Sequence, residues 1–324
     1  MQKYAYIILG FVFVSLCYLI FLSANIVFSN DLSLPKAKKQ AESQYRLVLI
    51  TRDLDTTFWN KVGKGATKQA QKEGASLEIW GSYSNNPEEF LKKLELAIHS
   101  KVDGIIIQGL DTDAFKDLTK VKAAFHGIPV ITVANDVPMS ESARRTYVGS
   151  NQYHAGILIA DQLLNDMGVK GKVVLLYDNQ KEHYQQERLN GIHDTLKKYP
   201  DITTIYAETP ESRDKVISTM RDVLNEVPDV DAFISISANM IGPMVQEIGK
   251  RSQVEPYFIY TFDDGPESLP LLAAGKIDGV IEQDPERMGE VSVQRLISWL
   301  RGETVPLDTR GYFTDIRILK DEPK

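Results

Sequence analysis

Between residues 46 and 135, short apolar runs alternate with longer stretches whose apolar residues recur at helical spacing. The short runs are almost continuously apolar, which is typical of strands buried on both faces of a parallel sheet. Parallel strands need long crossover connections, and each intervening stretch is long enough to supply a helix. The pattern therefore predicts a doubly wound α/β unit. The expected strands are 46–51, 77–81, 104–109 and 128–135, and the expected helices are 58–74, 87–100 and 113–126.

The same alternation begins again at Lys172 and continues to about residue 301. Two successive units of about 100 to 130 residues favour two similar α/β lobes over one large sheet. The chain has 324 residues, which is long enough for both lobes and an additional amino-terminal segment. In the second unit the expected strands are 172–178, 202–208, 232–237, 257–262 and 279–283, and the expected helices are 184–198, 210–226, 239–249, 265–274 and 285–301.

The amino-terminal segment has no charged side chain between Tyr4 and Asn30. About 20 apolar residues suffice to span a bilayer, whereas a secretory signal needs only about 7–15 and a small-x-small cleavage site. Residues 23–25 make a poor cleavage site, and Leu16 occupies the position before Cys17 where a lipoprotein signal requires a small residue. The length of the run also argues against a buried core helix.

We therefore expect an uncleaved transmembrane anchor at residues 1–30 and a polar juxtamembrane stalk at residues 31–45. Lysines on both sides of the anchor leave its orientation undecided by the positive-inside rule, which has little influence on large domains. The remaining chain, residues 46–319, is expected to form the globular part.

Composition excludes several classes of function. The formal net charge of −7 argues against a nucleic-acid surface, which requires a basic patch. The single cysteine, Cys17, permits no intramolecular disulfide, and the five histidines lack the spacing of a zinc site. No strand is followed by a nucleophile elbow, a P-loop or a dinucleotide-binding glycine motif. We expect no enzyme, no metal and no cofactor, and we expect the glycines of "KVGKGATK" to permit close helix packing.

In doubly wound sheets the ligand crevice lies outside the carboxyl ends of the strands. The residues that follow the apolar runs include arginine, aspartate, asparagine and glutamine, which can pair the hydroxyl groups of a polyhydroxyl ligand. The alternative is that these residues cap helices and form turns, as "DDGP" at 263–266 would. The candidate segments are 53–59, 108–111, 135–136, 178–188, 237–239, 263–264 and 283–284.

Two adjacent aromatic residues, Phe58 and Trp59, begin the first expected helix. Neighbouring side chains on a helix point about 100° apart, so both cannot lie on one buried face. One alternative is that one ring is core and the other covers a loop. The other is that an aromatic ring at the mouth of the crevice stacks on a sugar ring.

The segment "RLVLITRDLDTTFWNKVGKGATKQAQKEGASLEIW" resembles the first strand–helix–strand of type I periplasmic sugar-binding proteins. "VDGIIIQGLDTDA", "GIPVITVAND", "ERLNGI" and "YTFDDGPESLPLLAAGKIDGVIEQDPERMG" follow in the family's order, and the resemblance covers about residues 45 to 319. It implies two α/β lobes joined by a hinge that the chain crosses three times. The implied N-lobe is about 46–150 and 284–310, and the implied C-lobe is about 151–283 and 311–319.

The resemblance also implies a set of ligand-binding residues. Phe58 and Trp59 match the aromatic pair that packs on the sugar ring, and Gln283 matches the hinge glutamine. The chain departs from the family at Arg52, where a small or polar residue is usual, and after the fourth strand, where an Asp-Arg pair is common. It departs again after the eighth strand, where Asn-Asp is usual. The implied residues are Phe58, Trp59, Asn135 with Asp136 as its alternative, Arg188, Asn239, Asp263 and Gln283.

With an anchor in place of a DNA-binding segment, the chain resembles membrane-anchored sugar sensors that work beside a membrane histidine kinase. The implied function is extracytoplasmic recognition of a monosaccharide, with a pentose such as xylose favoured, through closure of the two lobes. The alternative is the binding subunit of an ABC sugar importer, whose partner would be a permease. An enzyme that acts on sugars is a third class, which the absence of catalytic motifs disfavours.

Overall fold

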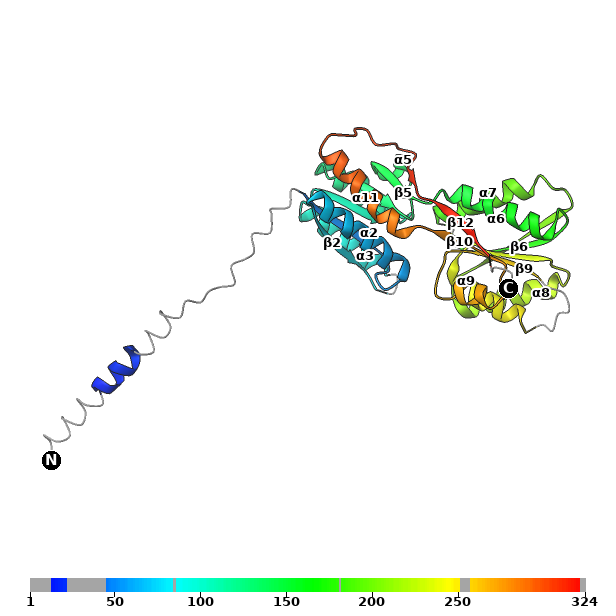
Figure 1. The fold of residues 1–324 in the computed structure, drawn as a ribbon, viewed down its shortest axis with the longest axis horizontal. Coiled ribbons are helices and arrows are strands. Elements are labelled where there is room, and N and C mark those ends of the chain that lie inside the picture. The colour runs from blue at the N-terminus through cyan, green and yellow to red at the C-terminus, as the bar shows by residue number, and fades with distance from the viewer. Residues whose placement is uncertain (1–12, 22–44, 84–85, 181, 251–256, 321–324) are drawn as a thin grey trace, which may run out of the picture. The chain divides into compact units, whose positions relative to one another are not determined.

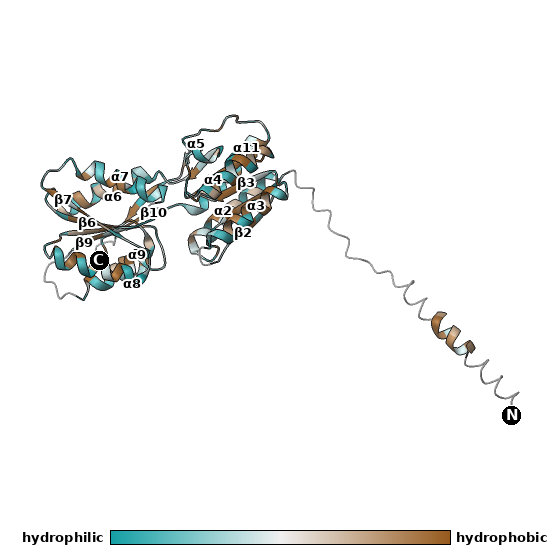
Figure 2. Ribbon diagram, turned by 180° about the vertical axis from the view of Figure 1, so that it is seen from behind, coloured by the Kyte–Doolittle hydropathy of each residue, from teal (hydrophilic) through white to brown (hydrophobic). Residues whose placement is uncertain are grey.

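The computed structural model describes residues 13–21, 45–83, 86–180, 182–250 and 257–320. The chain forms two compact units, Met1–Ser43 and Gln44–Lys324. In the first unit, residues 13–21 form an exposed apolar helix, drawn in brown in Figure 2. No helix among the described residues has the length and hydropathy needed to cross a membrane. The rest of the expected anchor, and the expected stalk apart from Tyr45, lie outside the described residues.

The second unit consists of two lobes, each built on a six-stranded sheet (Figure 1). The N-lobe sheet has the order β11-β5-β4-β3-β1-β2, and the C-lobe sheet has the order β12-β10-β9-β8-β6-β7. Every strand pair is parallel except β10 with β12. The prediction of two similar, doubly wound α/β lobes is therefore confirmed.

The elements of the N-lobe come from two separate parts of the chain. They are β1 (Arg46–Thr51), α2 (Thr57–Glu73), β2 (Ser76–Gly81), α3 (Pro87–His99), β3 (Gly104–Gln108), α4 (Asp113–Asp117), η1 (Leu118–Ala123), β4 (Val130–Val133), α5 (Met139–Ser142), β5 (Thr146–Gly149), α11 (Pro285–Leu300) and β11 (Tyr312–Phe313).

The elements of the C-lobe lie between these parts and at the end of the chain. They are α6 (Gln152–Met167), β6 (Gly171–Asp178), α7 (His183–Leu196), β7 (Ile202–Thr209), α8 (Arg213–Glu226), β8 (Ala232–Ser235), α9 (Ala238–Ile248), β9 (Phe258–Phe262), α10 (Ser268–Ala273), β10 (Gly279–Gln283) and β12 (Ile316–Leu319).

The sheets are buried on both faces, as their apolar runs predict. All five residues of β3 are buried, and Ile106 faces one core cluster of the N-lobe while Ile105 and Ile107 face the other. The C-lobe sheet likewise separates two clusters. Local capping sets the helix ends: the Thr56 hydroxyl accepts a hydrogen bond from the Trp59 amide, and Gly74 ends α2 with a left-handed φ of 69°.

Several details differ from the sequence expectations, and β5, α5, α6, β11 and β12 were not among the expected elements. The single helix expected at 113–126 is α4 followed by the π-helical segment η1. The chain crosses between the lobes three times, after β5, after β10 and after β11. The last crossing comes after Phe313, a few residues later than expected, because β11 pairs with β5 of the N-lobe before β12, in red in Figure 1, joins β10.

The glycines of the first helix allow it to pack closely on α11, as the sequence predicts. A Cβ at Gly65 would clash with the carbonyl oxygen of Glu286, and a Cβ at Gly289 would clash with the carbonyl oxygen of Val62. Both obstacles are backbone atoms, which cannot rotate away as a side chain can. The contact of α2 with α11 therefore holds residues 285–300 against residues 57–73 within the N-lobe.

We expect Gly65→Ala to destabilise the globular unit by about 1–3 kcal/mol, the usual cost of overpacking, despite alanine's better helix propensity. Gly249→Ala is the matched control, because its φ of −68° is helical and the nearest atom would lie 3.3 Å from the new Cβ. Urea denaturation of both variants measures the effect. Equal stability of the two variants would contradict the close-packing role of Gly65.

Candidate functional site

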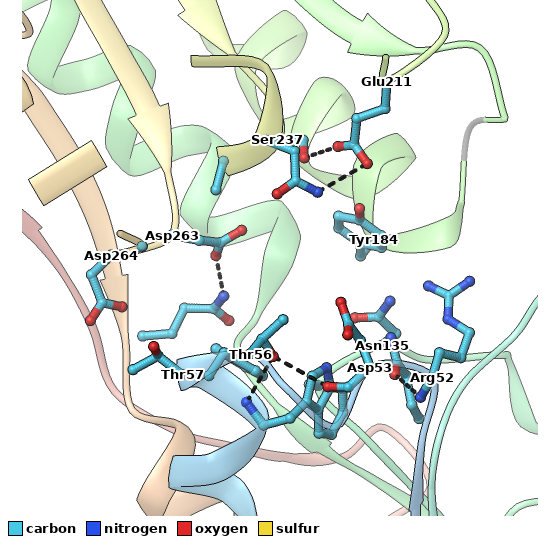
Figure 3. Close-up of a pocket in the computed structure, with 18 of the residues that line it drawn as sticks. Arg52, Asp53, Thr56, Thr57, Asn135, Tyr184, Glu211, Ser237, Asp263 and Asp264 are labelled. Atoms are coloured by element: carbon cyan, nitrogen blue, oxygen red, sulfur yellow. Dashed lines mark hydrogen bonds between the residues drawn. The ribbon is translucent and has the colours of Figure 1, made fainter. Parts of the chain in front are cut away.

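A cleft of about 260 Å³ lies between the lobes, where the carboxyl ends of both sheets meet (Figure 3). At this edge the strand order reverses between β1 and β3 in the N-lobe and between β6 and β8 in the C-lobe. Such a reversal point is the usual ligand position in doubly wound sheets. Seven of the eight predicted residues line the cleft: Phe58, Trp59, Asn135, Arg188, Asn239, Asp263 and Gln283.

The first turn of α2 supplies an aromatic wall to the cleft. The rings of Phe58 and Trp59 meet edge to face, with centroids 5.5 Å apart and planes at 78°. Trp59 is only 8% exposed and belongs to the N-lobe core, whereas Phe58 is partly buried and packs against that core. Both rings line the cleft, so the buried Trp59 fixes the position of the more accessible Phe58.

On the C-lobe wall, Arg188 organises the polar groups. Its guanidinium donates to both carboxylate oxygens of Asp263, at 3.1 Å each, to Gln152 Oε1 at 2.8 Å and to the Ile236 carbonyl at 2.8 Å. The side chain is 2% exposed and stacks on the rings of Phe262 and Tyr184. These bonds use four of the five guanidinium donors, which leaves one for a ligand.

Asp263 is fixed from both sides. Gln283 Nε2 donates to the oxygen of Asp263 that also accepts from Arg188 Nη2, and Gln283 Oε1 lies 3.5 Å from Gln152 Nε2. The φ of Asp263 is 70°, a left-handed value that is uncommon outside glycine and concentrates at functional sites. The hinge residue Gln283 is thus bonded to the carboxylate that faces the cleft.

The alternative to Asn135, Asp136, does not line the cleft. Arg144 donates Nε and Nη2 to the two carboxylate oxygens of Asp136, both at 2.6 Å, and the Thr132 hydroxyl donates to the same group at 2.6 Å. Asp136 is therefore paired within the N-lobe, away from the residues that line the cleft. The structure therefore places Asn135, and not Asp136, at the site.

The two lobes also contact each other across the cleft. Arg52, which follows β1, donates Nη1 and Nη2 to the two carboxylate oxygens of Glu182 at 2.7 and 3.2 Å, and Asn135 Nδ2 donates to Glu182 at 3.2 Å. Gln108 Oε1 accepts from the Arg52 amide at 2.9 Å, which fixes the backbone that carries the arginine. Lys61 forms a second bridge to Asp264 at 3.2 Å.

Sequence reasoning missed Glu211, which follows β7 and lines the cleft. The candidate segments omitted the end of the apolar run 202–208, and "TPE" at 209–211 is the signal that could have identified it. Glu211 accepts hydrogen bonds from the Ser237 hydroxyl and from Asn239 Nδ2 (Figure 3). Burial raises the pKa of Glu211, and the nearby carboxylates of Asp178 and Glu182 raise it further.

A model of the "Periplasmic binding protein domain" matches residues 47–304. The ribose import binding protein RbsB of Escherichia coli (strain K12) is 24% identical over 265 residues, which are 80% of this chain and 86% of that protein. The D-apiose import binding protein of Actinobacillus succinogenes is 25% identical over 259 residues, covering 79% of this chain and 82% of that protein.

Two solved structures have the same fold. GanP, a glucose-galactose binding protein from Geobacillus stearothermophilus, is 29% identical with a TM-score of 0.79, and the match covers 86% of this chain and 99% of that chain. A chain of the XylFII–LytSN complex is 22% identical with a TM-score of 0.73, and the match covers 85% and 97% of the two chains.

We expect Glu211→Gln to raise the melting temperature at pH 7 by about 2–4 °C, the shift that roughly 1 kcal/mol produces in a large domain. A raised pKa in the folded state means that the carboxylate opposes folding at every pH above that value. The gain should shrink as the pH falls through the raised pKa and disappear below the ordinary value of 4.5, where the carboxyl group is protonated in both states. Thermal unfolding across pH measures this.

The control is Glu226→Gln, the same change at an exposed position on α8. A Glu211→Gln protein that is less stable than the parent at pH 7, or a gain that persists unchanged at low pH, would contradict the prediction.

Proposed function

Because the chain belongs to the periplasmic binding protein family, we propose that its cleft binds a monosaccharide and that the binding domain acts outside the cytoplasm. Proteins of this family are binding proteins and not enzymes, in agreement with the sequence prediction. The observation that carries the proposal is an aromatic wall opposed to a network of fixed polar groups in one small cleft.

A sugar presents two kinds of surface, and the cleft has a partner for each. The C–H faces of the ring pack on an aromatic side chain, which Phe58 supplies. Each buried hydroxyl group must find a hydrogen-bond partner, since an unpaired polar group costs about 1–3 kcal/mol. Asp263 and Gln283 are held in place to accept and donate, and Arg188 retains one donor.

The relatives support a simple sugar without choosing one. Their names specify ribose, apiose, and glucose or galactose. We propose a pentose, with xylose tested first beside ribose, arabinose, glucose, galactose and allose. A thermal-shift screen of the full chain is suitable, since a ligand at 100 times its Kd stabilises the fold by about 2.7 kcal/mol. The absence of a shift with every sugar would overturn the proposal.

We further propose that the chain is a membrane-anchored sensor that passes the bound state to a membrane histidine kinase. The uncharged segment from Tyr4 to Asn30 supports an anchor. A similar chain occurs in the XylFII–LytSN complex, which supports a protein partner. The alternative role is the binding subunit of an importer, which the names of the ribose-binding and apiose-binding relatives support.

The aromatic wall yields a first test. Phe58→Ala should weaken sugar binding about 10- to 100-fold, because the roughly 1.5–3 kcal/mol gained by burying a large aromatic surface is lost. Titration calorimetry measures the affinity and thermal unfolding measures the stability. Trp59→Ala, the comparison, should lower both, since Trp59 is part of the core. Unchanged affinity in Phe58→Ala would remove this ring from the site.

The mechanism yields a second test. Phe58 and Asn135 belong to one lobe, and Arg188 and Asp263 to the other, so a ligand that touches both lobes favours the closed form. We expect saturating sugar to reduce the radius of gyration of a fragment spanning residues 44–324, measured by X-ray scattering. An unchanged radius would show that binding does not close the lobes.

The anchor yields a third test. The full chain should stay in the membrane fraction after high-salt and alkaline washes, with its amino terminus intact by mass spectrometry. A chain that begins at Gln44 should be released into the soluble fraction. Recovery of a processed or lipid-modified form would instead favour the importer subunit.

A further inference from the structure

The two contacts that join the lobes across the cleft use side chains outside the predicted ligand-binding set. Arg52 and Glu182 meet on one side, with side-chain exposures of 11% and 17%, and Lys61 and Asp264 meet on the other, with exposures of 45% and 7%. Figure 3 shows Arg52 and Asp264 at opposite ends of the cleft. The pairs therefore fasten the cleft at both ends.

The stronger contact is centred on Glu182. Its carboxylate accepts two hydrogen bonds from Arg52 and one from Asn135, all from the opposite lobe. Glu182 itself does not line the cleft, and it makes no side-chain capping bond at the start of α7. A side chain that neither faces the ligand nor caps its helix has its principal contacts across the lobe boundary.

Asn135 takes part in this contact through its side-chain amide, the same group that was expected to bind the ligand. Its Nδ2 donates to Glu182, and the Nε of Arg52 is buried with no hydrogen-bond partner among the described residues. In an open cleft all three groups would be solvated, so the bonds form only when the lobes are together. Because the pair is little exposed, salt screens it less than a surface pair.

From this arrangement we propose that Arg52, Glu182 and Asn135 form an interlobe latch that sets sugar affinity through the population of the closed form, with Lys61–Asp264 as a second, weaker contact. This inference rests on the proposed function. Such a latch positions the two lobes without touching the sugar through Glu182. It changes the apparent Kd, which equals the intrinsic Kd divided by the fraction of chains in the binding-competent form.

A smaller closed population and a lost ligand contact change the affinities for a set of sugars in different ways. Weakening the latch lowers the competent fraction, so every sugar loses affinity by the same factor. A residue that touches the ligand affects each sugar differently, according to the hydroxyl group it meets. The pattern across several sugars therefore separates the two roles.

The test is Glu182→Gln, which keeps the size of the side chain and removes its charge. In the full chain we expect the affinity for each sugar that binds to fall by the same five- to tenfold factor. In the fragment 44–324 without sugar, we expect a larger radius of gyration than in the parent. Lys61→Met should act in the same direction but less, because Lys61 is more exposed.

The matched control is Lys64→Met, since Lys64 lies on the same helix but pairs with Glu286 at 3.0 Å within one lobe. It should change neither the scattering nor the affinities. An unchanged sugar-free radius in Glu182→Gln overturns the latch, and so does an affinity loss that differs from sugar to sugar. If no sugar binds the parent chain, the proposed function fails, and the sugar-free scattering alone still decides whether the latch exists.

Discussion

The pair formed by the buried Arg188 and the partly exposed Asp263 is the interaction on which the cleft depends. An arginine that is 2% exposed requires a carboxylate and further acceptors, because an unpaired buried charge is very costly. Those acceptors come from α6, from the end of β8 and from the end of β9, so one side chain holds three segments of the C-lobe in register. Through Gln283, which also bonds Asp263, the same network reaches the hinge. The carboxylate that faces the cleft and the chain crossing after β10 are therefore one hydrogen-bonded unit.

Much of the fold could be predicted from the sequence because its signals are local. Continuous apolar runs such as "GIIIQ" can only be buried on both faces, and the spacing between them allows little except a crossover helix. Two of the elements that the pattern did not predict, β11 and η1, lack such signals. β11 is two residues long, and its place in the N-lobe sheet depends on pairing with β5, more than 160 residues earlier in the chain. η1 has the same apolar spacing as an α-helix, so its π-helical bonds have no counterpart in the pattern.

Local sequence signals do not distinguish the residues that line the cleft from those that stabilise the fold. Asp136 and Asp263 both follow a strand, and both are candidates in the sequence, Asp136 as the alternative to Asn135. The structure separates them by position: Asp263 lines the cleft and Asp136 does not, although each carboxylate accepts two hydrogen bonds from an arginine. Arg144 lies eight residues from its partner and Arg188 lies 75 residues from its own, and no spacing rule joins either pair. Glu211 was missed for a different reason: it follows the apolar run 202–208, whose end was left out of the candidate segments although β7 pairs with β6 in the sheet that lines the cleft.

The likeness of the two lobes explains where the cleft forms but not how readily it closes. Each sheet brings its carboxyl end to the same boundary, so the side chains that follow the strands line both walls of the cleft. The balance between open and closed forms depends instead on which side chains meet across the boundary. Arg52 stands where the family usually has a small or polar residue, and it meets Glu182, to which Asn135 also donates. Arg52 and Asn135, which is a predicted ligand contact, thus share one carboxylate of the opposite lobe. In such a site, affinity is a property of the lobe boundary as much as of the groups that touch the ligand, since closure and binding share one free energy.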